Sequence, residues 1–337
     1  MTHARIFDRG MEIDLPLPPG ITALHGPVGS GKTALTESIA GFRSPARGRV
    51  LIDDAIVFDA DAGVDVPPRL RRCGWVGERE ALFPHMTVLE NMLFAAGRWA
   101  RLERTRRAAE MLERFALVAI ADKTPQELDA ASRLRVEMAR ALITEPRVLL
   151  VDRRGSDEAL LRLTGEAFDG PALIVMEDLD CCYAIGCRLA LVEGGRLVAF
   201  GAARELMERP ENDDAARLAG FGNVYQATVS ALDPGRNTCR LECGDFVLSA
   251  PYLKGHLNGD RVSVGIRAED VRVHSHLVEE DVNFVQVSLL RVTERPRTVR
   301  LEFAGGIAAE ISREQYVRQK DNQAWQVEFP PSSLRIF

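Results

Sequence analysis

The sequence predicts an α/β domain followed by an all-β domain. Three observations predict this order. Residues 21–25 are a short apolar strand, followed by a glycine-rich loop and a helical segment at 34–41. Residues 147–152 form a second apolar strand, which ends in Asp152. After Asn223 the chain changes to short alternating segments that Gly and Pro turns separate, which is typical of a small barrel.

The composition of the chain excludes several classes of protein. The chain has 337 residues, of which 46% are hydrophobic and 27% charged, enough to bury a core and to exclude wholesale disorder. Its net charge of −6 disfavours a nucleic-acid partner. The six cysteines are irregularly placed, which indicates reduced thiols. No run approaches 18 apolar residues and the first ten residues lack a signal-peptide core, so we expect a cytoplasmic protein.

The loop after the first strand matches the pattern G-x-x-x-x-G-K-[ST]. Glycines let its backbone curl so that N–H groups and the helix N-terminus face phosphate oxygens. Lys32 would reach the β- and γ-phosphates. A glycine turn without a ligand is the alternative. The predicted nucleotide-binding residues are Gly26, Pro27, Val28, Gly29, Ser30, Gly31, Lys32, Thr33 and Ala34.

Two oxygen ligands are candidates for a magnesium ion. The Thr33 hydroxyl follows Lys32 directly, and Asp152 ends the second apolar strand. A hard cation beside phosphates takes such oxygen ligands, directly or through water. The predicted cofactors are therefore ATP and Mg²⁺.

Three further segments narrow the class of nucleotide-binding protein. Arg-Arg-Cys-Gly-Trp-Val at 71–76, Leu-Phe-Pro-His-Met-Thr-Val-Leu-Glu-Asn at 82–91 and the helix at 132–142 stand in order between Lys32 and Asp152. With them the chain resembles ATP-binding subunits of ABC transporters, and among these the importers of molybdate and related oxyanions. The resemblance implies an ABC-type P-loop NTPase fold with a helical subdomain.

The resemblance also implies an organisation and partners. An ABC domain would span residues 1–222, with its helical subdomain at about 85–142 and a linker near 210–214. An all-β, OB-like domain would span 223–337, in two halves at 223–275 and 283–337. The implied partners are a second ATP-binding subunit, identical or different, and a membrane permease subunit that docks near 83–88. The subunit would then sit at the inner face of the cell membrane, and its β-domain could bind an oxyanion. Phe7 could stack on adenine or belong to the core.

Four positions depart from the family pattern. Glu78 replaces a Gln that contacts Mg²⁺ and the attacking water. Asp129, within Leu-Asp-Ala-Ala, replaces the Ser of a Leu-Ser-Gly-Gly loop that clasps ATP on the opposite subunit. Arg153 replaces the carboxylate that polarises water, and Glu177 replaces a His that contacts the γ-phosphate.

These departures predict a subunit that binds Mg-ATP but hydrolyses it poorly, a pseudo-ATPase. Phosphoryl transfer depends on stabilising the charge of the γ-phosphoryl oxygens, and a carboxylate about 4 Å away costs up to roughly 4 kcal/mol. The alternatives are an active importer ATPase with atypical groups, an oxyanion-sensing regulator that is not an enzyme, and a scaffold without a ligand. Arg153 stands where the family has a carboxylate, and Glu177 and Glu78 stand where it has basic or neutral groups. This change of charge also predicts an ion pair between Arg153 and Glu177 or Glu78, worth about 1 kcal/mol or less if exposed.

Overall fold

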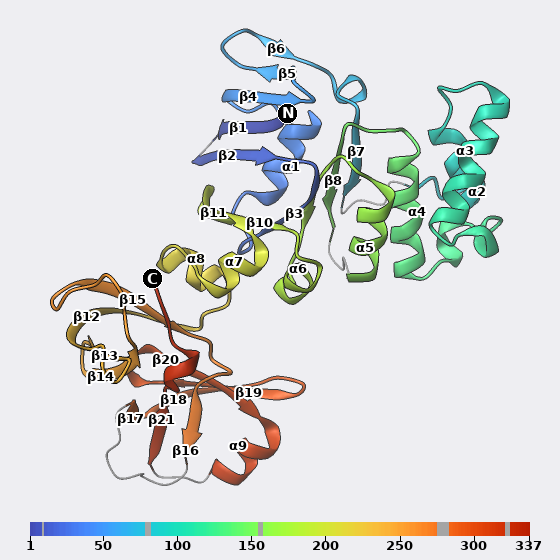
Figure 1. Ribbon diagram of the computed structural model, residues 1–337. Coiled ribbons are helices and arrows are strands. Elements are labelled where there is room, and N and C mark those ends of the chain that lie inside the picture. Colours follow the sequence, from blue (N-terminus) through green and yellow to red (C-terminus); the bar gives the residue numbers. More distant parts are fainter. Residues whose placement is uncertain (9, 78–81, 154–157, 275–282, 321–323) are drawn as a thin grey trace. The chain divides into compact units, whose positions relative to one another are not determined.

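The computed structural model describes residues 1–337 except 9, 78–81, 154–157, 275–282 and 321–323. It consists of two compact units, Met1–Arg204 and Glu205–Phe337 (Figure 1). Each unit is described separately below. None of the helices in the described ranges combines the length and apolarity needed to cross a membrane.

The first unit is built on one mixed sheet with the strand order β6-β5-β4-β1-β2-β11-β10-β3-β9-β8-β7. Its outer strands pair antiparallel, whereas β10, β3, β9, β8 and β7 run parallel. The strands are β1 (Thr2–Asp8), β2 (Met11–Leu17), β3 (Gly20–His25), β4 (Arg47–Ile52), β5 (Ala55–Asp59), β6 (Val64–Asp65), β7 (Cys73–Gly77), β8 (Val148–Asp152), β9 (Pro171–Val175), β10 (Arg188–Glu193) and β11 (Arg196–Ala202).

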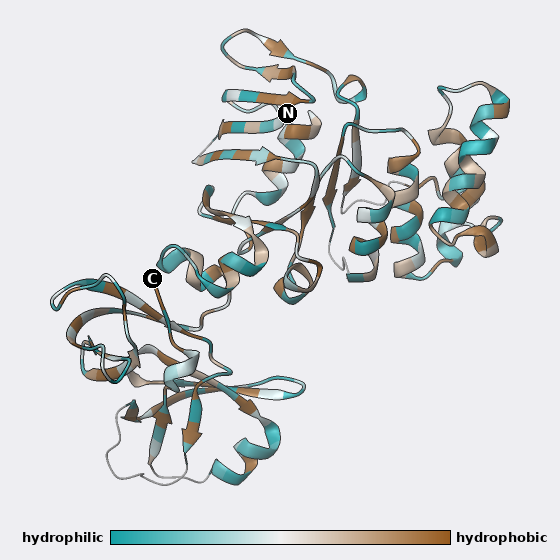
Figure 2. Cartoon of the chain, in the orientation of Figure 1, coloured by the Kyte–Doolittle hydropathy of each residue, from teal (hydrophilic) through white to brown (hydrophobic). Residues whose placement is uncertain are grey.

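The parallel strands bring the candidate site together. Every residue of β8 is buried, as a strand covered on both faces requires, and Figure 2 shows the central strands as hydrophobic. The carboxyl ends of parallel strands meet at one edge of a sheet, where ligands of such folds bind. The loop after β3, Asp152 at the end of β8 and Glu177 after β9 therefore lie at the same edge.

Helices cover this sheet and extend from it. They are α1 (Lys32–Ala40), α2 (Val88–Ala95), α3 (Arg101–Arg114), α4 (Ala130–Leu142), α5 (Glu158–Ala167) and α6 (Leu179–Ile185), with 3₁₀ turns η1 (Pro68–Leu70), η2 (Val118–Ile120) and η3 (Pro125–Glu127). In Figure 1, α4 lies between the β7–β8 edge and the pair α2–α3, which is the expected helical insertion. A capping box of Thr87 and Glu90 begins α2.

A buried arginine closes the far end of α1. The Arg71 side chain has no exposed surface, and its Nη1 donates to the carbonyls of Ser38 (2.7 Å) and Ile39 (3.0 Å) in the last turn of α1. Its Nη2 pairs with Asp65 at 2.8 Å. These carbonyls have no partner within the helix, so Arg71 supplies the donors that they lack.

The second unit is rich in β-structure, as predicted, and has a single core. Its strands are β12 (Asn223–Asp233), β13 (Thr238–Cys243), β14 (Phe246–Pro251), β15 (Arg261–Ile266), β16 (Arg272–His274), β17 (Phe284–Val287), β18 (Leu289–Glu294), β19 (Thr298–Phe303), β20 (Ile307–Ser312), β21 (Trp325–Glu328) and β22 (Arg335–Ile336). They form sheets in the orders β14-β13-β12-β15-β22, β16-β21-β17 and β18-β19-β20. Short helices α7 (Ala203–Glu208), α8 (Asp213–Leu218) and α9 (Arg313–Gln319) and turns η4 (Ala304–Gly306) and η5 (Pro331–Ser333) complete the chain.

The two proposed halves of this unit exchange strands. β22 from the second half pairs with β15, and β16 from the first half pairs with β21. Buried residues from both, including Val229, Leu241, Leu301 and Phe329, belong to one core. The ranges 223–275 and 283–337 therefore share sheets and one core in this structure.

The predicted linker at 210–214 is wrong in part, because α8 begins at Asp213. The Asn212 side chain accepts a hydrogen bond from the Ala215 N–H at 2.8 Å and so caps this helix. Asp213 also accepts a bond of 2.7 Å from Gln226 of β12. These contacts explain why the unit begins at Glu205, before the change at 222/223 that composition suggests.

Candidate nucleotide-binding site

The loop between β3 and α1 has the backbone that its glycines predict. Gly29 and Gly31 have φ of 83° and 98°, a conformation that other residues rarely adopt. A Cβ on Gly26 would lie 2.0 Å from the Val192 carbonyl oxygen of β10, so only glycine fits there. The backbone is thus held close to the sheet edge, and α1 begins at Lys32 with its N-terminus at the loop.

Lys32 folds back over the loop. Its Nζ donates to the carbonyls of Gly26 (2.7 Å) and Pro27 (2.8 Å). Burial lowers the pKa of Lys32, and the charges of Asp152 and Glu177 oppose that shift. The ammonium group is therefore held inside the loop by neutral acceptors that a phosphate oxygen can replace.

Asp152, at the end of β8, lies against the first turn of α1, the turn that contains Thr33. Asp152 is 6% exposed, and the Thr36 hydroxyl of α1 lies 3.2 Å from its Oδ2. The Thr33 side chain is exposed, and its carbonyl accepts from Thr36 at 2.9 Å. Thr36 therefore ties the carboxylate of β8 to the first turn of α1, a contact that the sequence analysis did not predict.

These residues fit a nucleotide and its metal ion. A Cβ would fill the cradle at Gly26, Lys32 supplies a positive charge, and Thr33 and Asp152 supply the oxygen donors that Mg²⁺ takes. Residues 26–34 would hold the phosphates, while Mg²⁺ would neutralise part of their charge.

Glu177 and His25 complete the edge of the sheet. The charge of Glu177 is close enough to influence both Lys32 and His25. His25 Nδ1 lies 3.0 Å from the Met176 carbonyl oxygen, which joins the end of β3 to the residue before Glu177. Glu177 thus follows β9 at this edge of the sheet, and His25 is an additional polar group beside it.

Asp129 has a structural role that the sequence analysis missed. It is the N-cap of α4, where its Oδ1 accepts a hydrogen bond of 2.7 Å from the Ser132 N–H. That bond holds the pKa of Asp129 below its usual value, so the side chain stays a carboxylate. The negative charge predicted at this position is therefore fixed by the helix that it starts.

Arg153 directly follows β8, and its Nη1 pairs with Oε2 of Glu137 in α4. The sequence analysis did not consider this partner. The predicted bridge to Glu177 stays a prediction, and Glu78 lies outside the described residues. Glu137 could have been found from the sequence, because it interrupts the apolar stripe of Leu134, Met138 and Ala141 at helical spacing.

Comparison with known proteins identifies the family. An ABC transporter family model matches residues 11–153. The molybdenum import ATP-binding protein ModC of Paramagnetospirillum magneticum is 31% identical over 78% of this chain and 75% of its own length. ModC of Rhodospirillum rubrum is 33% identical over 75% and 70%. The chain belongs to the ABC transporter family of ATP-binding proteins.

Other relatives within this family carry different names. The spermidine/putrescine import ATP-binding protein PotA of Roseobacter denitrificans is 32% identical over 77% of this chain and 72% of its own. A solved ATP-binding subunit of an ABC transporter matches with a TM-score of 0.52 at 20% identity, covering 61% of this chain and 91% of that one. The structure of cbiO1 from Clostridium perfringens matches with a TM-score of 0.53 at 22% identity, covering 61% and 89%. These structures share the ABC fold.

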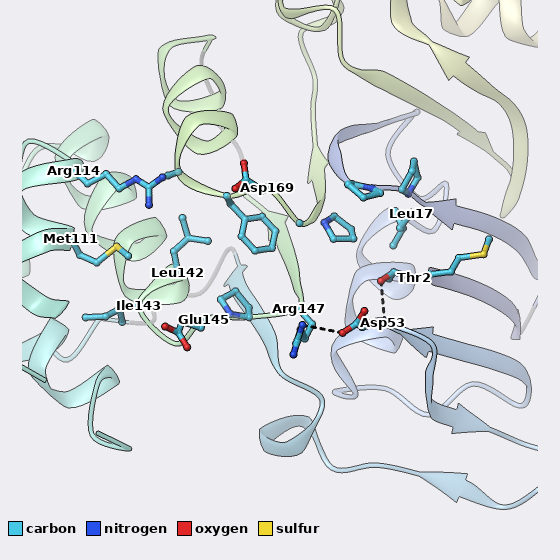
Figure 3. A pocket seen from close by; sticks show the side chains of 18 of the residues that line it. Thr2, Leu17, Asp53, Met111, Arg114, Leu142, Ile143, Glu145, Arg147 and Asp169 are labelled. Carbon is cyan, nitrogen blue, oxygen red and sulfur yellow. Dashed lines mark hydrogen bonds and ion pairs between the residues drawn. The ribbon is translucent and has the colours of Figure 1, made fainter. Parts of the chain in front are cut away.

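Two cavities lie apart from the glycine-rich loop at residues 26–34. One, of about 590 Å³, is lined by the outer face of β1 and β4, where Arg5 and Arg47 lie 5.5 and 5.9 Å from the Phe7 ring centroid. Phe7 is therefore outside the apolar core to which Ala4 and Ile6 belong. A second cavity, of about 790 Å³, lies near the amino ends of the parallel strands and has the Asp53–Arg147 ion pair in its lining (Figure 3).

Proposed function

We propose that this chain is the ATP-binding subunit of an ABC importer of the molybdate type, and that it holds Mg-ATP but hydrolyses it poorly. The observation that carries the proposal is that groups suited to binding phosphate and a group unsuited to hydrolysis lie at the same edge of the sheet. The glycine loop, Lys32 and Asp152 are arranged to bind phosphate and metal. Glu177 stands at the same edge with a charge that opposes the reaction.

The chemistry explains both halves of the proposal. Binding needs donors and positive charge around the phosphates, which residues 26–33 provide. Hydrolysis needs more: a base for the attacking water and groups that stabilise the charge spreading over the γ-phosphoryl oxygens. A guanidinium at Arg153 cannot serve as that base, because an arginine side chain has only N–H donors and no acceptor. Each missing catalytic group commonly costs about 10²–10⁴ in rate.

Partners follow from the same family membership. ABC sites are composite, so a second ATP-binding subunit, identical or different, would supply the segment that corresponds to residues 128–131. In a homodimer this segment would place the Asp129 carboxylate near the phosphates. Residues 83–88 would dock a membrane permease subunit, which places the protein at the inner face of the cell membrane. The second unit would bind the oxyanion or modulate the first.

The test is Mg-ATP binding and turnover on the purified full chain. We expect calorimetry or a fluorescent ATP analogue to show binding that Lys32→Ala weakens at least about tenfold, through loss of the phosphate contact. We expect phosphate release below about 1% of the median enzyme rate of about 10 s⁻¹. Arg69→Ala, a charge removal at an exposed site, is the matched control.

The alternatives predict different outcomes of these measurements. Turnover of about 1 s⁻¹ or more that Lys32→Ala abolishes would establish an active ATPase with atypical groups. Binding of molybdate or tungstate without ATP binding would indicate an oxyanion-sensing regulator. Failure to bind either would indicate a scaffold. Titration with spermidine in the same calorimeter separates an oxyanion ligand from a polyamine.

A further inference from the structure

A charged cluster begins where β8 ends. Arg153 pairs with Glu137, whose side chain is only 2% exposed, while that of Arg153 is 18% exposed. Glu137 lies on the buried face of α4 together with Leu134 and Met138. A buried carboxylate is costly unless a cation pairs with it, so the position of Arg153 matters to the packing of α4.

The cluster continues along α4. Arg140 lies one helical turn after Glu137 and interacts electrostatically with it. Burial lowers the pKa of Arg140, and the charge of Glu137 opposes that shift. The guanidinium of Arg140 lies 5.7 Å from the ring centroid of Phe83. Glu137 is therefore shared between a cation at the sheet edge and a cation that contacts residue 83.

Phe83 is in turn fixed to α2. Its N–H donates to Oδ1 of Asn91 at 2.9 Å, and Nδ2 of Asn91 donates to the carbonyls of Phe83 (3.2 Å), Met86 (3.2 Å) and Thr87 (3.0 Å). Asn91 is fully buried, and the rings of Phe83 and Phe94 meet edge-to-face at 4.6 Å. The segment 83–87 is therefore fixed to α2, and Arg140 of α4 contacts it at Phe83.

We propose that Arg153 is a positioning residue: by pairing with Glu137 it holds α4 against β8 and, through Arg140 and Phe83, sets the position of residues 83–87. The exchange of a carboxylate for Arg at 153 then has a second consequence besides loss of a base. It connects the nucleotide-binding edge to an exposed segment by contacts that need no nucleotide. Only the meaning of this link for transport rests on the proposed function, which places the membrane subunit at 83–88.

The pairing is tested by a double-mutant cycle on the full chain without nucleotide. We expect Arg153→Ala and Glu137→Ala each to lower the Tm by roughly 5–10 °C, because each removes one half of the Arg153–Glu137 ion pair, in which the carboxylate is buried. The double variant should lose clearly less than the sum of the two. Arg162→Ala is the matched control, since its pair with Glu158 is on the exposed face of α5 and should change the Tm by about 2 °C or less. Additive losses would overturn the pairing.

The link to residues 83–87 is tested by hydrogen exchange on the same proteins. Arg153→Ala should raise the exchange rates of amides at 83–91 by about threefold or more, whereas Arg162→Ala should not. A merely local role of Arg153 would leave these amides unchanged, and that result would overturn the proposal. If Glu137→Ala does not fold, Glu137→Gln and the charge-swapped pair Arg153→Glu with Glu137→Arg replace it, and the swapped pair must have a higher Tm than either single variant.

ATP binding is measured in a separate experiment. If the chain does not bind ATP, the proposed function fails, but the Tm and exchange results still test the link between Arg153 and residues 83–87.

Discussion

Asp129 caps helix α4, and under the proposed function the same side chain would oppose the chemistry. As N-cap it satisfies the Ser132 N–H, and its carboxylate would place negative charge at the composite site, where the family pattern has the hydroxyl of Ser. Ser caps helices as well as Asp does, so the hydroxyl of the family would keep the cap without the charge. Stability alone therefore does not explain why a carboxylate stands here.

The capping role predicts different effects for two replacements of Asp129. Asp129→Ser should leave the Tm within about 1 °C, whereas Asp129→Ala should lower it by roughly 2–4 °C, because the first turn of α4 loses an acceptor. Thermal unfolding followed by circular dichroism at 222 nm measures both. Equal losses in the two variants would mean that the side chain does not cap the helix.

His25 makes stability depend on pH. Burial is the main cause that lowers the pKa of His25 in the folded chain below its unfolded value of about 6.5. Below that pH the unfolded chain takes up a proton that the folded chain binds less well, so this group's contribution to stability is present above about pH 6.5 and lost as pH falls. His25→Gln should therefore flatten the fall in unfolding free energy between pH 7 and 5.5. Urea titrations at several pH values measure the unfolding free energy of both proteins. If it falls equally with pH in the two, His25 is not the group responsible.

At the level of single residues the sequence predicts identities better than partners. The loop residues, Lys32 and Asp152 follow from a fixed motif with its flanking strand and helix. The partners of Thr36 and Glu137 could not be assigned, because they are Asp152, which ends β8, and Arg153, which follows it. Only the folded sheet brings this strand end to α1 and α4. The Glu137 interruption of an apolar stripe signals a buried partner but not which one.

Helix α1 is held at both ends, by the glycine loop at its N-terminus and by Arg71 at its C-terminus. A Cβ on Gly41 would lie 2.6 Å from Nε of Arg71, so the helix ends where this side chain crosses it. Arg71 also donates Nε to the Val66 carbonyl at 2.7 Å. The loop that would hold the phosphates thus begins a helix whose last turn is anchored to residues 65–71, which include the end of β6 and the turn η1.

Removing that anchor should destabilise the first unit strongly. Arg71→Met keeps much of the volume but deprives the carbonyls of Ser38, Ile39 and Val66 of donors, so we expect a loss of about 3 kcal/mol in unfolding free energy. Arg69→Met, two residues earlier and exposed, should change it by less than about 0.5 kcal/mol. Urea denaturation measures both, and equal effects would remove the special role of the buried position.

The elements themselves follow from the sequence with uneven success. The β3–loop–α1 order and α4 have the expected places, because strong apolar patterns define them. The alternating apolar segment at 285–292 does not form one strand, because β17 ends at Val287 and β18 begins at Leu289 in a different sheet. α9 was not predicted, since five of its seven residues are polar or charged and its start depends on the Ser312 cap.

On the scale of the whole molecule, the two units have separate cores. Alternation and turns predicted the β-rich nature of the second unit. Strand exchange between its halves could not be predicted, because the partners β15 and β22 are far apart in the sequence and β22 contains only two residues.

Truncation tests the extent of the second unit. Residues 205–337 should unfold cooperatively on their own, whereas 223–337 should have a lower Tm, because it lacks α8 and the contact of Phe221 with Arg267 at 4.8 Å. Residues 223–275 should not fold, since β15 and β16 lose their partners. Circular dichroism melts compare the three. Cooperative unfolding of 223–275 would show that the first half is an independent module after all.

The pairing of β22 with β15 also orders events during biosynthesis. Sheets close only when both strands are available, and nascent domains generally fold as units from the amino end. The α/β unit can become compact while the ribosome is still adding residues. The second unit can pair β22 with β15 only after residues 335–336 have been made, so the five-stranded sheet gains this edge strand last.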